Sequence, residues 1–364
     1  MLTLAHGMVE TPVFMPVGTV GVVKTMLPDE LEQAGAEIIL ANTYHLYLRP
    51  GDKLIAKFGG LNNFIRWKKP ILTDSGGYQV FSLGEGIRNL TKSKLKKSKI
   101  SDLGVIFYSH LDGTEHLMTP EKSIQVQKNL GSDLMMALDD CPPANASYQR
   151  VKQAVLRTQK WYQRCLNEHN KSHGGSLVPI CQGGRFADLR RMSCEFLNAT
   201  DAKILAVGGV SVGESKRDIY RVMEICGRQL DEKRPHYVMG IGYPEDMIAA
   251  IMRGMDMFDC VLPTRLARHG IIWKKSKSTK AVKLAVGYGY EQIDISKSAY
   301  RSQRAIIDKY CQCLACRNQF SLAYLSHLIK EREPLGIHLL SDHNLNFVFN
   351  LINDARLAIK NNSL

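Results

Sequence analysis

The feature that most constrains the fold is a recurring unit, in which a short apolar run is followed at once by small or polar residues. The apolar runs lie at 38–41, 70–73, 133–138, 177–180, 204–207, 236–239 and 257–258. Amphipathic helical patterns, such as those at 150–169 and 214–230, fill much of the space between them. Short buried strands that alternate with helices indicate a parallel sheet. This many units favour a (β/α)8 TIM barrel.

The competing fold is a doubly wound sheet that binds a dinucleotide. Its fingerprint, Gly-x-Gly-x-x-Gly after the first strand, is absent, and Gly-Gly pairs follow several different strands instead. Active sites of parallel barrels lie at the carboxyl ends of the strands. We therefore expect the polar residues that follow the apolar runs to converge on one site.

Asp74 and Asp259 are the two catalytic candidates, because each follows an apolar run and is flanked by Ser, Gly or Cys. Two facing carboxylates can divide the work at an acetal-like carbon, where one attacks and the other moves protons. The N-glycosidic bond of a nucleoside contains such a carbon. The alternative from spacing alone is that both residues cap helices or loops.

A second group of strand-end residues is suited to binding a purine. Asp139 and Asp140 could accept hydrogen bonds from the N–H edge of guanine, as cytosine does. Gln182 and the backbone of 208–209 could read the carbonyl edge. Tyr78 and Met239 could stack on either face of the base. Each of these residues, taken singly, is more often a core residue.

The chain carries a formal net charge of +13, which points to a polyanionic partner. Lysines are concentrated in segments 92–99 and 274–283. Arg265 and Arg268 follow Asp259 closely, where they could hold phosphates of a polynucleotide. Nucleic acid is the favoured partner, and two solvated basic loops are the alternative.

Cys311, Cys313 and Cys316 form a Cys-x-Cys-x-x-Cys cluster that is typical of a tetrahedral zinc site. A histidine would complete the four ligands, and His327, His338 and His343 are all near enough in sequence. Because four protein ligands leave no open position, the sequence predicts one structural zinc ion that stabilises a C-terminal subdomain. The alternative is three buried cysteines without a metal.

The chain is expected to be cytoplasmic. Its nine cysteines are an odd number, and three of them follow a metal-binding pattern, which suits a reducing compartment. No run of about 18 apolar residues is present, so no membrane span is predicted. The first residues lack the basic start and long apolar run of a signal peptide.

With these motifs in place, the chain resembles the bacterial-type tRNA-guanine transglycosylase family, also called queuine tRNA-ribosyltransferase. The resemblance covers essentially the whole chain in order, and its motifs together are highly specific. They are Asn-Thr-Tyr-His-Leu at 42–46, Arg-Pro-Gly at 49–51, Asp-Ser-Gly-Gly-Tyr-Gln at 74–79, Ser-His-Leu-Asp-Gly at 109–113, Gln-Gly-Gly at 182–184, Gly-Gly at 208–209, Phe-Asp-Cys-Val-Leu-Pro-Thr-Arg at 258–265 and the cysteine cluster.

The resemblance implies a (β/α)8 barrel with a zinc-binding subdomain, in a homodimer. We expect the catalytic barrel at 1–300, the zinc-binding subdomain at 301–350 and a C-terminal helix or tail at 351–364. The implied reaction replaces guanine at the wobble position of tRNAs with a GUN anticodon by a 7-deazaguanine, through a covalent enzyme–RNA intermediate, in queuosine biosynthesis.

The resemblance also implies roles for individual residues. Asp259 would be the nucleophile, Asp74 the general acid and base, and His343 the fourth zinc ligand. The residues expected to bind the base are Ser75, Gly76, Gly77, Tyr78, Asp139, Gln182, Gly208, Gly209 and Met239. The residues expected to contact RNA are Gly240, Ile241, Gly242, Tyr243, Pro244, Glu245, Asp246, Thr264, Arg265, Leu266, Ala267 and Arg268.

The pocket sequence bears on which base enters. Leu138-Asp139-Asp140 and Ser211 resemble eukaryotic members that use queuine. Cys141 and Val212 resemble bacterial members that use the smaller 7-aminomethyl-7-deazaguanine, and this smaller base is favoured.

Two other functions remain open. One is a non-catalytic RNA-binding subunit of a two-chain transglycosylase, which would lack a usable nucleophile. The other is an archaeal-type enzyme acting in the D-arm of tRNA, which would carry a further C-terminal RNA-binding domain. A basic insertion near 90–104 is longer than is usual in the family.

Overall fold

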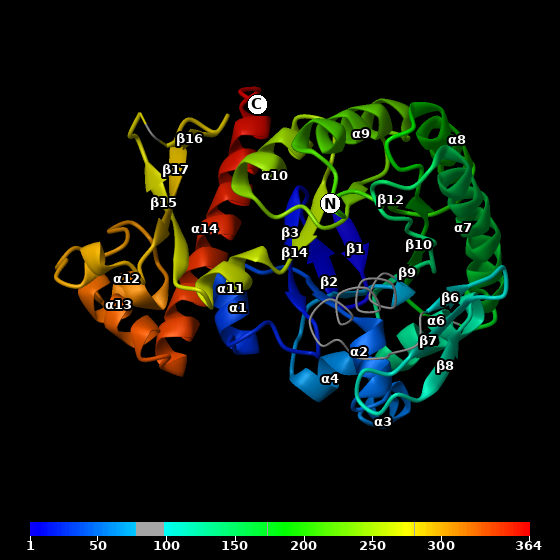
Figure 1. Ribbon diagram of the computed structural model, residues 1–364, viewed down its shortest axis with the longest axis horizontal. Helices are drawn as coiled ribbons and strands as arrows, with labels where there is room; N and C mark the ends of the chain where they lie inside the picture. Colours follow the sequence, from blue (N-terminus) through cyan, green and yellow to red (C-terminus); the bar gives the residue numbers. More distant parts are fainter. Residues whose placement is uncertain (78–97, 173, 280) are drawn as a thin grey trace.

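The computed structural model describes residues 1–77, 98–172, 174–279 and 281–364, and within them a ring of parallel strands forms the centre of the molecule (Figure 1). The strands of this sheet are β3 (Val13–Gly18), β4 (Ile39–Ala41), β5 (Ile71–Thr73), β9 (Leu134–Met136), β10 (Ser176–Val178), β11 (Ile180–Cys181), β12 (Leu205–Val207), β13 (His236–Val238) and β14 (Met257–Cys260). Their order in the sheet is β10-β9-β5-β4-β3-β14-β13-β12-β11.

The sheet closes on itself at β10 and β11. Only Pro179 separates these two pieces, so they are one strand in which β10 pairs with β9 and β11 pairs with β12. All pairings within the ring are parallel, as a (β/α)8 barrel requires. The predicted fold class is confirmed.

Strand β3 is the barrel strand that the sequence analysis missed. Its segment is fully buried, and it joins β4 to β14 through parallel pairing. Pro16 lies inside it, and a proline within an apolar run argues against a central strand because it removes a hydrogen-bond donor. Here the apolar residues on both sides of Pro16 outweigh that signal.

Alternation along each strand divides the core into two layers. Val13, Met15 and Val17 of β3 point into the barrel interior, together with residues such as Leu40 of β4 and Leu72 of β5. Their sequence neighbours face outward and pack against the surrounding helices, as Phe14 does. This period of two residues is the geometry of a strand buried on both faces.

An N-terminal hairpin covers the end of the barrel at which the strands begin. It consists of β1 (Leu2–Leu4) and β2 (Gly7–Val9), and Leu2 and Val9 join the interior cluster. His6 binds the carboxylate of Asp133, which also accepts a hydrogen bond of 2.9 Å from the backbone N–H of Ile71. The opposite end, where the strands finish, carries the polar residues described below.

Helices surround the barrel on its outer face (Figure 1). They are α1 (Pro28–Ala34), α2 (Thr43–Leu48), α3 (Asp52–Lys57), α4 (Leu61–Ile65), α6 (Pro120–Leu130), α7 (Tyr148–His169), α8 (Ala187–Asn198), α9 (Lys216–Gln229), α10 (Pro244–Ile251) and α11 (Leu262–Ala267). Helices α7 and α9 confirm the patterns at 150–169 and 214–230. Ser147 and Ser215 cap them by accepting hydrogen bonds from backbone N–H groups of the first turn.

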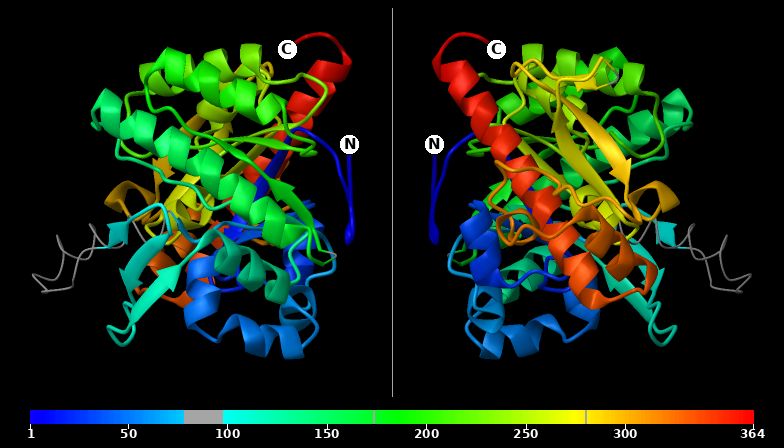
Figure 2. Two further views of the ribbon diagram at one scale, coloured as in Figure 1. Left: turned by 90° about the vertical axis from the view of Figure 1, so that its right-hand side faces the viewer. Right: turned by 90° about the vertical axis from the view of Figure 1, so that its left-hand side faces the viewer.

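A small antiparallel sheet is inserted between β5 and α6. Its strands are β6 (Lys99–Ile100), β7 (Val105–Tyr108) and β8 (Glu115–Met118), which project from the side of the barrel in Figure 2. Most of the basic segment 92–99 and of the insertion near 90–104 lies outside the described residues.

The C-terminal part of the chain lies beside the barrel and has a core of its own (Figure 1). It contains the antiparallel strands β15 (Ile271–Ser276), β16 (Val282–Lys283) and β17 (Gly289–Asp294), a short 3-10 helix, η1 (Ser298–Tyr300), and the helices α12 (Leu314–Arg317), α13 (Leu322–Lys330) and α14 (Pro334–Lys360).

Helix α14 contributes to both cores, with Leu339 and Leu340 in the C-terminal core and Phe349 and Ile352 against the barrel. It continues through residue 350, and the division of the chain at 300 and 350 stays a prediction. No helix in the described ranges has both the length and the apolar character needed to cross a membrane.

Candidate active site

Asp74 follows β5 and is held at the carboxyl end of the barrel by hydrogen-bond donors from the neighbouring strand end. The backbone N–H of Thr43 donates to Asp74 Oδ1 at 2.8 Å, and the side-chain amide of Asn42 donates to Oδ2. The N–H of Gly76 donates to Oδ1 at 3.2 Å. These donors fix the orientation of the carboxylate, which is 7 % exposed.

Asp259 lies in β14, and its side chain is positioned by the adjacent strand β13. The hydroxyl of Tyr237 and the backbone N–H of Gly240 donate to Asp259 Oδ1 at 2.7 and 2.8 Å. Burial raises the pKa of Asp259, while these two hydrogen bonds oppose the rise. A carboxylate that is partly desolvated and held by two donors is suited to attack a carbon centre.

Asp74 and Asp259 both lie towards the carboxyl end of the parallel barrel, after β5 and within β14. Burial raises the pKa of Tyr237 well above its usual value, and the charges of Asp259 and then Asp74 add to that rise. Asp74 also acts on Asp139, whose pKa it raises. The strand-end acids lie at one end of the barrel, as parallel strands require.

Asp139 forms the floor of the site together with Gln182. The amide Nε2 of Gln182 donates to Asp139 Oδ2 at 2.7 Å, and the hydroxyl of Ser75 lies 3.5 Å from Oδ1. Burial raises the pKa of Asp139 to about 6, with a further contribution from the charge of Asp140. The protonation state of this carboxyl therefore changes close to neutral pH.

Gln182 is fully buried, and its carbonyl oxygen Oε1 has no hydrogen-bond partner among the described residues. A side chain at Gly209 would place its Cβ 2.4 Å from this oxygen, and a Cβ at Gly208 would lie 2.9 Å from Gln182 Nε2. Gly209 also has φ +60°, a conformation that favours glycine. The Gly-Gly pair thus leaves room for Gln182 and brings backbone close to it. The sulfur of Met239 borders the same glycines, 3.5 Å from the Cβ position of Gly208.

Asp140 differs from its neighbour, because its carboxylate is ion-paired with two arginines. Arg150 binds it through both terminal nitrogens and Arg157 binds it at 2.6 Å, while its side chain is 0 % exposed. Both oxygens of Asp140 are therefore engaged by arginines, which argues against its predicted role as an acceptor for a base. The same role for Asp139 stays a prediction. Asp140 joins the loop after β9 to helix α7.

The residues that the sequence analysis connected with the identity of the base follow Asp140 and Gly209 along the chain. Cys141 is partly exposed, and Val210 is buried. The carboxylate of Glu214 accepts a hydrogen bond of 2.8 Å from the N–H of Val212, so it stabilises the tight turn that follows Gly209. Ser211 in this turn is exposed and has φ +64°.

Segment 240–246 leads from β13 into α10, and most of its side chains are engaged within the protein. Tyr243 is 38 % exposed, and the ammonium of Lys216 lies 5.4 Å from its ring centre. Lys216 also binds the carboxylates of Glu245 and Asp246 at 2.6 and 3.1 Å. Gly240, Ile241, Gly242 and Pro244 shape the turn around these residues.

Helix α11 begins three residues after Asp259 and contains residues 264–267, and Arg268 caps its C-terminal end. Arg265 and Arg268 are exposed, whereas Thr264 and Ala267 are buried, and Leu266 is partly buried. The two arginines therefore extend from one side of a short helix beside the nucleophile candidate. Tyr78, the predicted stacking residue, lies outside the described residues, next to Ser75, Gly76 and Gly77, which are all buried.

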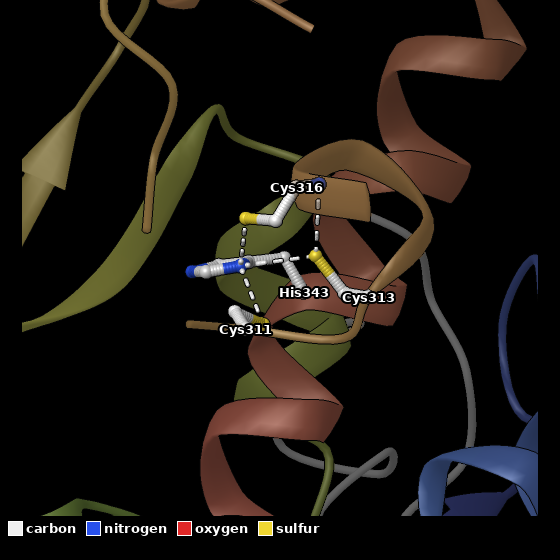
Figure 3. Close-up of side chains that lie close together, drawn as sticks. All are labelled: Cys311, Cys313, Cys316 and His343. Atoms are coloured by element: carbon white, nitrogen blue, oxygen red, sulfur yellow. Dashed lines mark hydrogen bonds between the residues drawn. The ribbon is translucent and has the colours of Figure 1, made fainter. Parts of the chain in front are cut away.

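A second constellation lies in the C-terminal core, where the three clustered cysteines surround His343 (Figure 3). The ring atom Nδ1 of His343 is 3.6 Å from Cys311 Sγ, 3.3 Å from Cys313 Sγ and 3.7 Å from Cys316 Sγ. A tetrahedral zinc ion with usual bond lengths would separate such nitrogen and sulfur atoms by about 3.6 Å. The four atoms therefore fit one ion.

The surroundings of His343 support the same fit. Its other ring atom, Nε2, lies 2.8 Å from the carbonyl oxygen of Trp273, which is the usual second partner of a metal-bound histidine. The rival histidines are placed elsewhere. His327 is exposed on α13, and His338 binds the carbonyl of Thr25 and the carboxylate of Glu30.

Three residues with a positioning role were not recognised as such from the sequence. Asn42 and Tyr237 hold the two catalytic candidates, and Arg190 donates to the backbone carbonyls of Gly208 and Gly209. Tyr237 is the polar-tipped member of an apolar run, which is a weak signal. Arg190 lies within an amphipathic helix, where nothing in the pattern separates it from exposed arginines.

Comparison with known proteins agrees with this geometry. The family model described as "Queuine tRNA-ribosyltransferase" matches residues 1–364. The "Queuine tRNA-ribosyltransferase" of Fusobacterium nucleatum is 46% identical over 362 residues, which cover 99% of this chain and 90% of that protein. The protein of the same description from Halothermothrix orenii is 44% identical over 363 residues, covering 100% of this chain and 90% of the relative. The resemblance inferred from the motifs is confirmed, and the chain belongs to the queuine tRNA-ribosyltransferase family.

Proposed function

We propose that this protein is a tRNA-guanine transglycosylase, which replaces guanine at the wobble position of GUN-anticodon tRNAs by a 7-deazaguanine in queuosine biosynthesis. The observation that carries the proposal is the meeting of Asp74, Asp259 and the Asp139–Gln182 pair at one end of the barrel. The names of its relatives, which refer to queuine and tRNA, agree with this reaction.

In the first half of the reaction, a carboxylate oxygen of Asp259 attacks C1′ of the ribose. The new C–O bond forms as the glycosidic C–N bond breaks, which leaves the RNA esterified to Asp259. Because Tyr237 and Gly240 both donate to Oδ1, Oδ2 is the oxygen assigned to the attack. Asp74 supplies a proton to the departing guanine.

In the second half, Asp74 takes the proton from the nitrogen of the incoming base that forms the new bond. That nitrogen attacks C1′ and displaces the carboxylate of Asp259, so the enzyme returns to its starting state. The donors from Asn42, Thr43 and Gly76 keep the Asp74 carboxylate in one orientation through both halves. A fixed orientation lowers the entropic cost of each proton transfer.

The base is recognised along two edges. The ionised carboxylate of Asp139 accepts hydrogen bonds from the N–H edge of guanine, while the backbone of Gly209 lies along the opposite edge. Oε1 of Gln182 adds a buried acceptor that has no partner among the described residues, and such an atom favours a ligand that offers it a donor. Met239 contacts one face of the base, and Tyr78 is assigned to the other.

Arg265 and Arg268 are assigned to the phosphates of the anticodon loop, because they are exposed beside Asp259. Tyr243 is the member of segment 240–246 that is open to RNA, with Lys216 next to it. The other residues of segments 240–246 and 264–268 position these three. We also propose that the enzyme works in the cytoplasm as a homodimer.

The non-catalytic alternative is less well supported. A scaffold subunit has no need for two carboxylates that are each oriented by several donors, whereas Asp74 and Asp259 both are. The archaeal-type alternative shares this chemistry but acts in the D-arm of tRNA, so an assay with a GUN-anticodon stem-loop separates it from the main proposal.

The Cys311, Cys313, Cys316 and His343 cluster is proposed to hold one structural zinc ion. When bound, the ion links the loop before α12 to the middle of α14. The four side chains occupy the tetrahedral positions, so the site has no open position for substrate.

The central test is the substitution Asp259→Asn. We expect base exchange to fall by on the order of 10³-fold or more, because an amide does not attack carbon as a carboxylate does. Incorporation of labelled guanine into tRNA measures the loss. Wild-type protein should also give a denaturation-resistant protein–RNA band that the variant lacks. The exposed Asp201→Asn serves as the control, and an Asp259→Asn variant that exchanges base at the wild-type rate would refute the assignment.

The raised pKa of Asp139 predicts that base binding depends on pH. With its pKa raised to about 6, the carboxyl is ionised and accepts two hydrogen bonds above that pH, and it is protonated below it. We therefore expect KM for guanine to rise as the pH falls through about 6, while KM for tRNA shows no matching step. Steady-state kinetics between about pH 5 and pH 8 test this. An unchanged KM for guanine across that range would contradict the role of Asp139.

Zinc content tests the metal proposal. We expect one zinc ion bound by the four ligands, and the substitution Cys313→Ser should lower the thermal midpoint, because the ion's binding energy contributes to folding. Metal analysis and thermal unfolding measure both effects. The substitution His338→Ala is the matched control and should leave zinc affinity unchanged. If His343→Ala also kept full zinc affinity, His343 would be excluded as the fourth ligand.

The incoming base is proposed to be 7-aminomethyl-7-deazaguanine. Cys141 and Val212 flank the pocket, and queuine would need extra volume near them, at a cost of about 1–3 kcal/mol in a close-packed wall. The salt bridges of Asp140 also keep its side chain from moving aside. We expect kcat/KM on one tRNA to favour the small base by roughly 10-fold. A higher kcat/KM for queuine would mean that the Leu138-Asp139-Asp140 pattern was the better guide.

A further inference from the structure

We propose that Cys181, Cys194 and Cys226 form a second metal site, for a thiophilic divalent ion, directly behind the base pocket. The three cysteines come from β11, α8 and α9, and each side chain is 0 % exposed. Their sulfur atoms all lie within 4.8 Å of one another. This cluster is separate from the Cys311, Cys313, Cys316 and His343 site.

The sulfur positions fit a shared ion. Cys181 Sγ is 3.7 Å from Cys194 Sγ and 3.9 Å from Cys226 Sγ. Two thiolates on one zinc ion with bonds of usual length are about 3.8 to 4.0 Å apart, for tetrahedral or trigonal geometry. A disulfide would need a separation near 2.05 Å and would leave the third sulfur unpaired.

The charge balance favours a divalent ion. Arg190 is 0 % exposed and lies next to the cluster, with Nη1 3.9 Å from Cys181 Sγ. The described residues give its guanidinium only carbonyl and sulfur partners, and no carboxylate. A buried charge is costly without an opposite charge. Three thiolates, one divalent ion and one guanidinium sum to zero.

Ordinary packing of cysteine as a small apolar residue does not require this arrangement. Cys165 is equally buried in another part of the core, and its sulfur lies near a backbone carbonyl rather than near other thiols. In the proposed site, three different elements each direct a thiol to one point beside a buried cation. A bound metal ion explains this arrangement better than apolar packing does. Thiolate ligands select soft ions such as zinc and cadmium.

The site is coupled to the base pocket through the backbone. Cys181 immediately precedes Gln182, which binds Asp139. Arg190 donates to the carbonyl oxygens of Gly208 and Gly209 at 2.8 and 3.0 Å, so the cation that balances the cluster also fixes the Gly-Gly turn. An ion at this site would fix the position of β11 relative to the turn formed by Gly208 and Gly209.

The test is the number of metal ions in the purified full-length protein. Native mass spectrometry and elemental analysis should find two thiophilic ions per chain in protein from zinc-supplemented cells or after cadmium loading. Cys226→Ser should reduce the count by one, while Cys165→Ser, the matched control for a buried thiol, should leave it unchanged. Circular dichroism verifies that each variant is folded.

The number of metal ions bound per wild-type chain tests the proposal even if the variants do not fold. A single ion per chain, under both zinc and cadmium, would overturn it. So would two ions that persist in a folded Cys226→Ser variant. Cadmium-113 NMR of the wild type adds an independent measurement: a thiolate-only site and a site with a histidine ligand should give two distinct signals, and one signal alone would contradict the second site.

Discussion

The whole site depends on the closure of the parallel barrel at residues 176–181. Because β10 pairs with β9 and β11 pairs with β12, every strand is fixed in register between two neighbours. All strands run in the same direction, so their carboxyl ends meet at one rim. That rim brings together carboxylates more than a hundred residues apart in sequence, and it also gives each of them donors from the adjacent strand.

Three acids share this rim, and their local partners separate their chemistry. Asp74 is oriented by backbone and amide donors from the end of β4, and Asp259 by a tyrosine hydroxyl and a glycine N–H. The amide of Gln182 donates to Asp139, and this hydrogen bond lowers the pKa of the carboxyl. Burial has the larger effect and raises that pKa to about 6. A proton-transfer group, a nucleophile and a base-binding group can thus be made from one residue type by environment alone.

The sequence predicted the features that depend on local pattern. Apolar runs followed by polar residues located most barrel strands and their functional ends, since burial on both faces requires continuous apolar segments. The missed strand β3 contains Pro16, whose local signal opposes the pairing that tertiary contacts impose. The pattern also could not separate Asp139 from Asp140, because the arginines that pair with Asp140 come from α7. Likewise, spacing alone left three histidines as candidates for the fourth zinc ligand, because only the fold shows that His343 faces the cysteines.

The zinc-site candidate and helix α11 are connected through neighbouring residues of α14. His343 points to the cysteine cluster, while the side chain of Asn344 bridges the barrel and the C-terminal sheet. Its amide donates to the carbonyls of Pro263 and Ile271 at 3.0 Å, and its oxygen accepts from the N–H of Trp273 at 3.1 Å. Pro263 lies in α11, which contains the exposed Arg265 and ends just before Arg268. A metal ion that fixes His343 would therefore also fix α11, the helix that follows Asp259. An ion far from the proposed catalytic carboxylates would in this way still influence the position of Arg265.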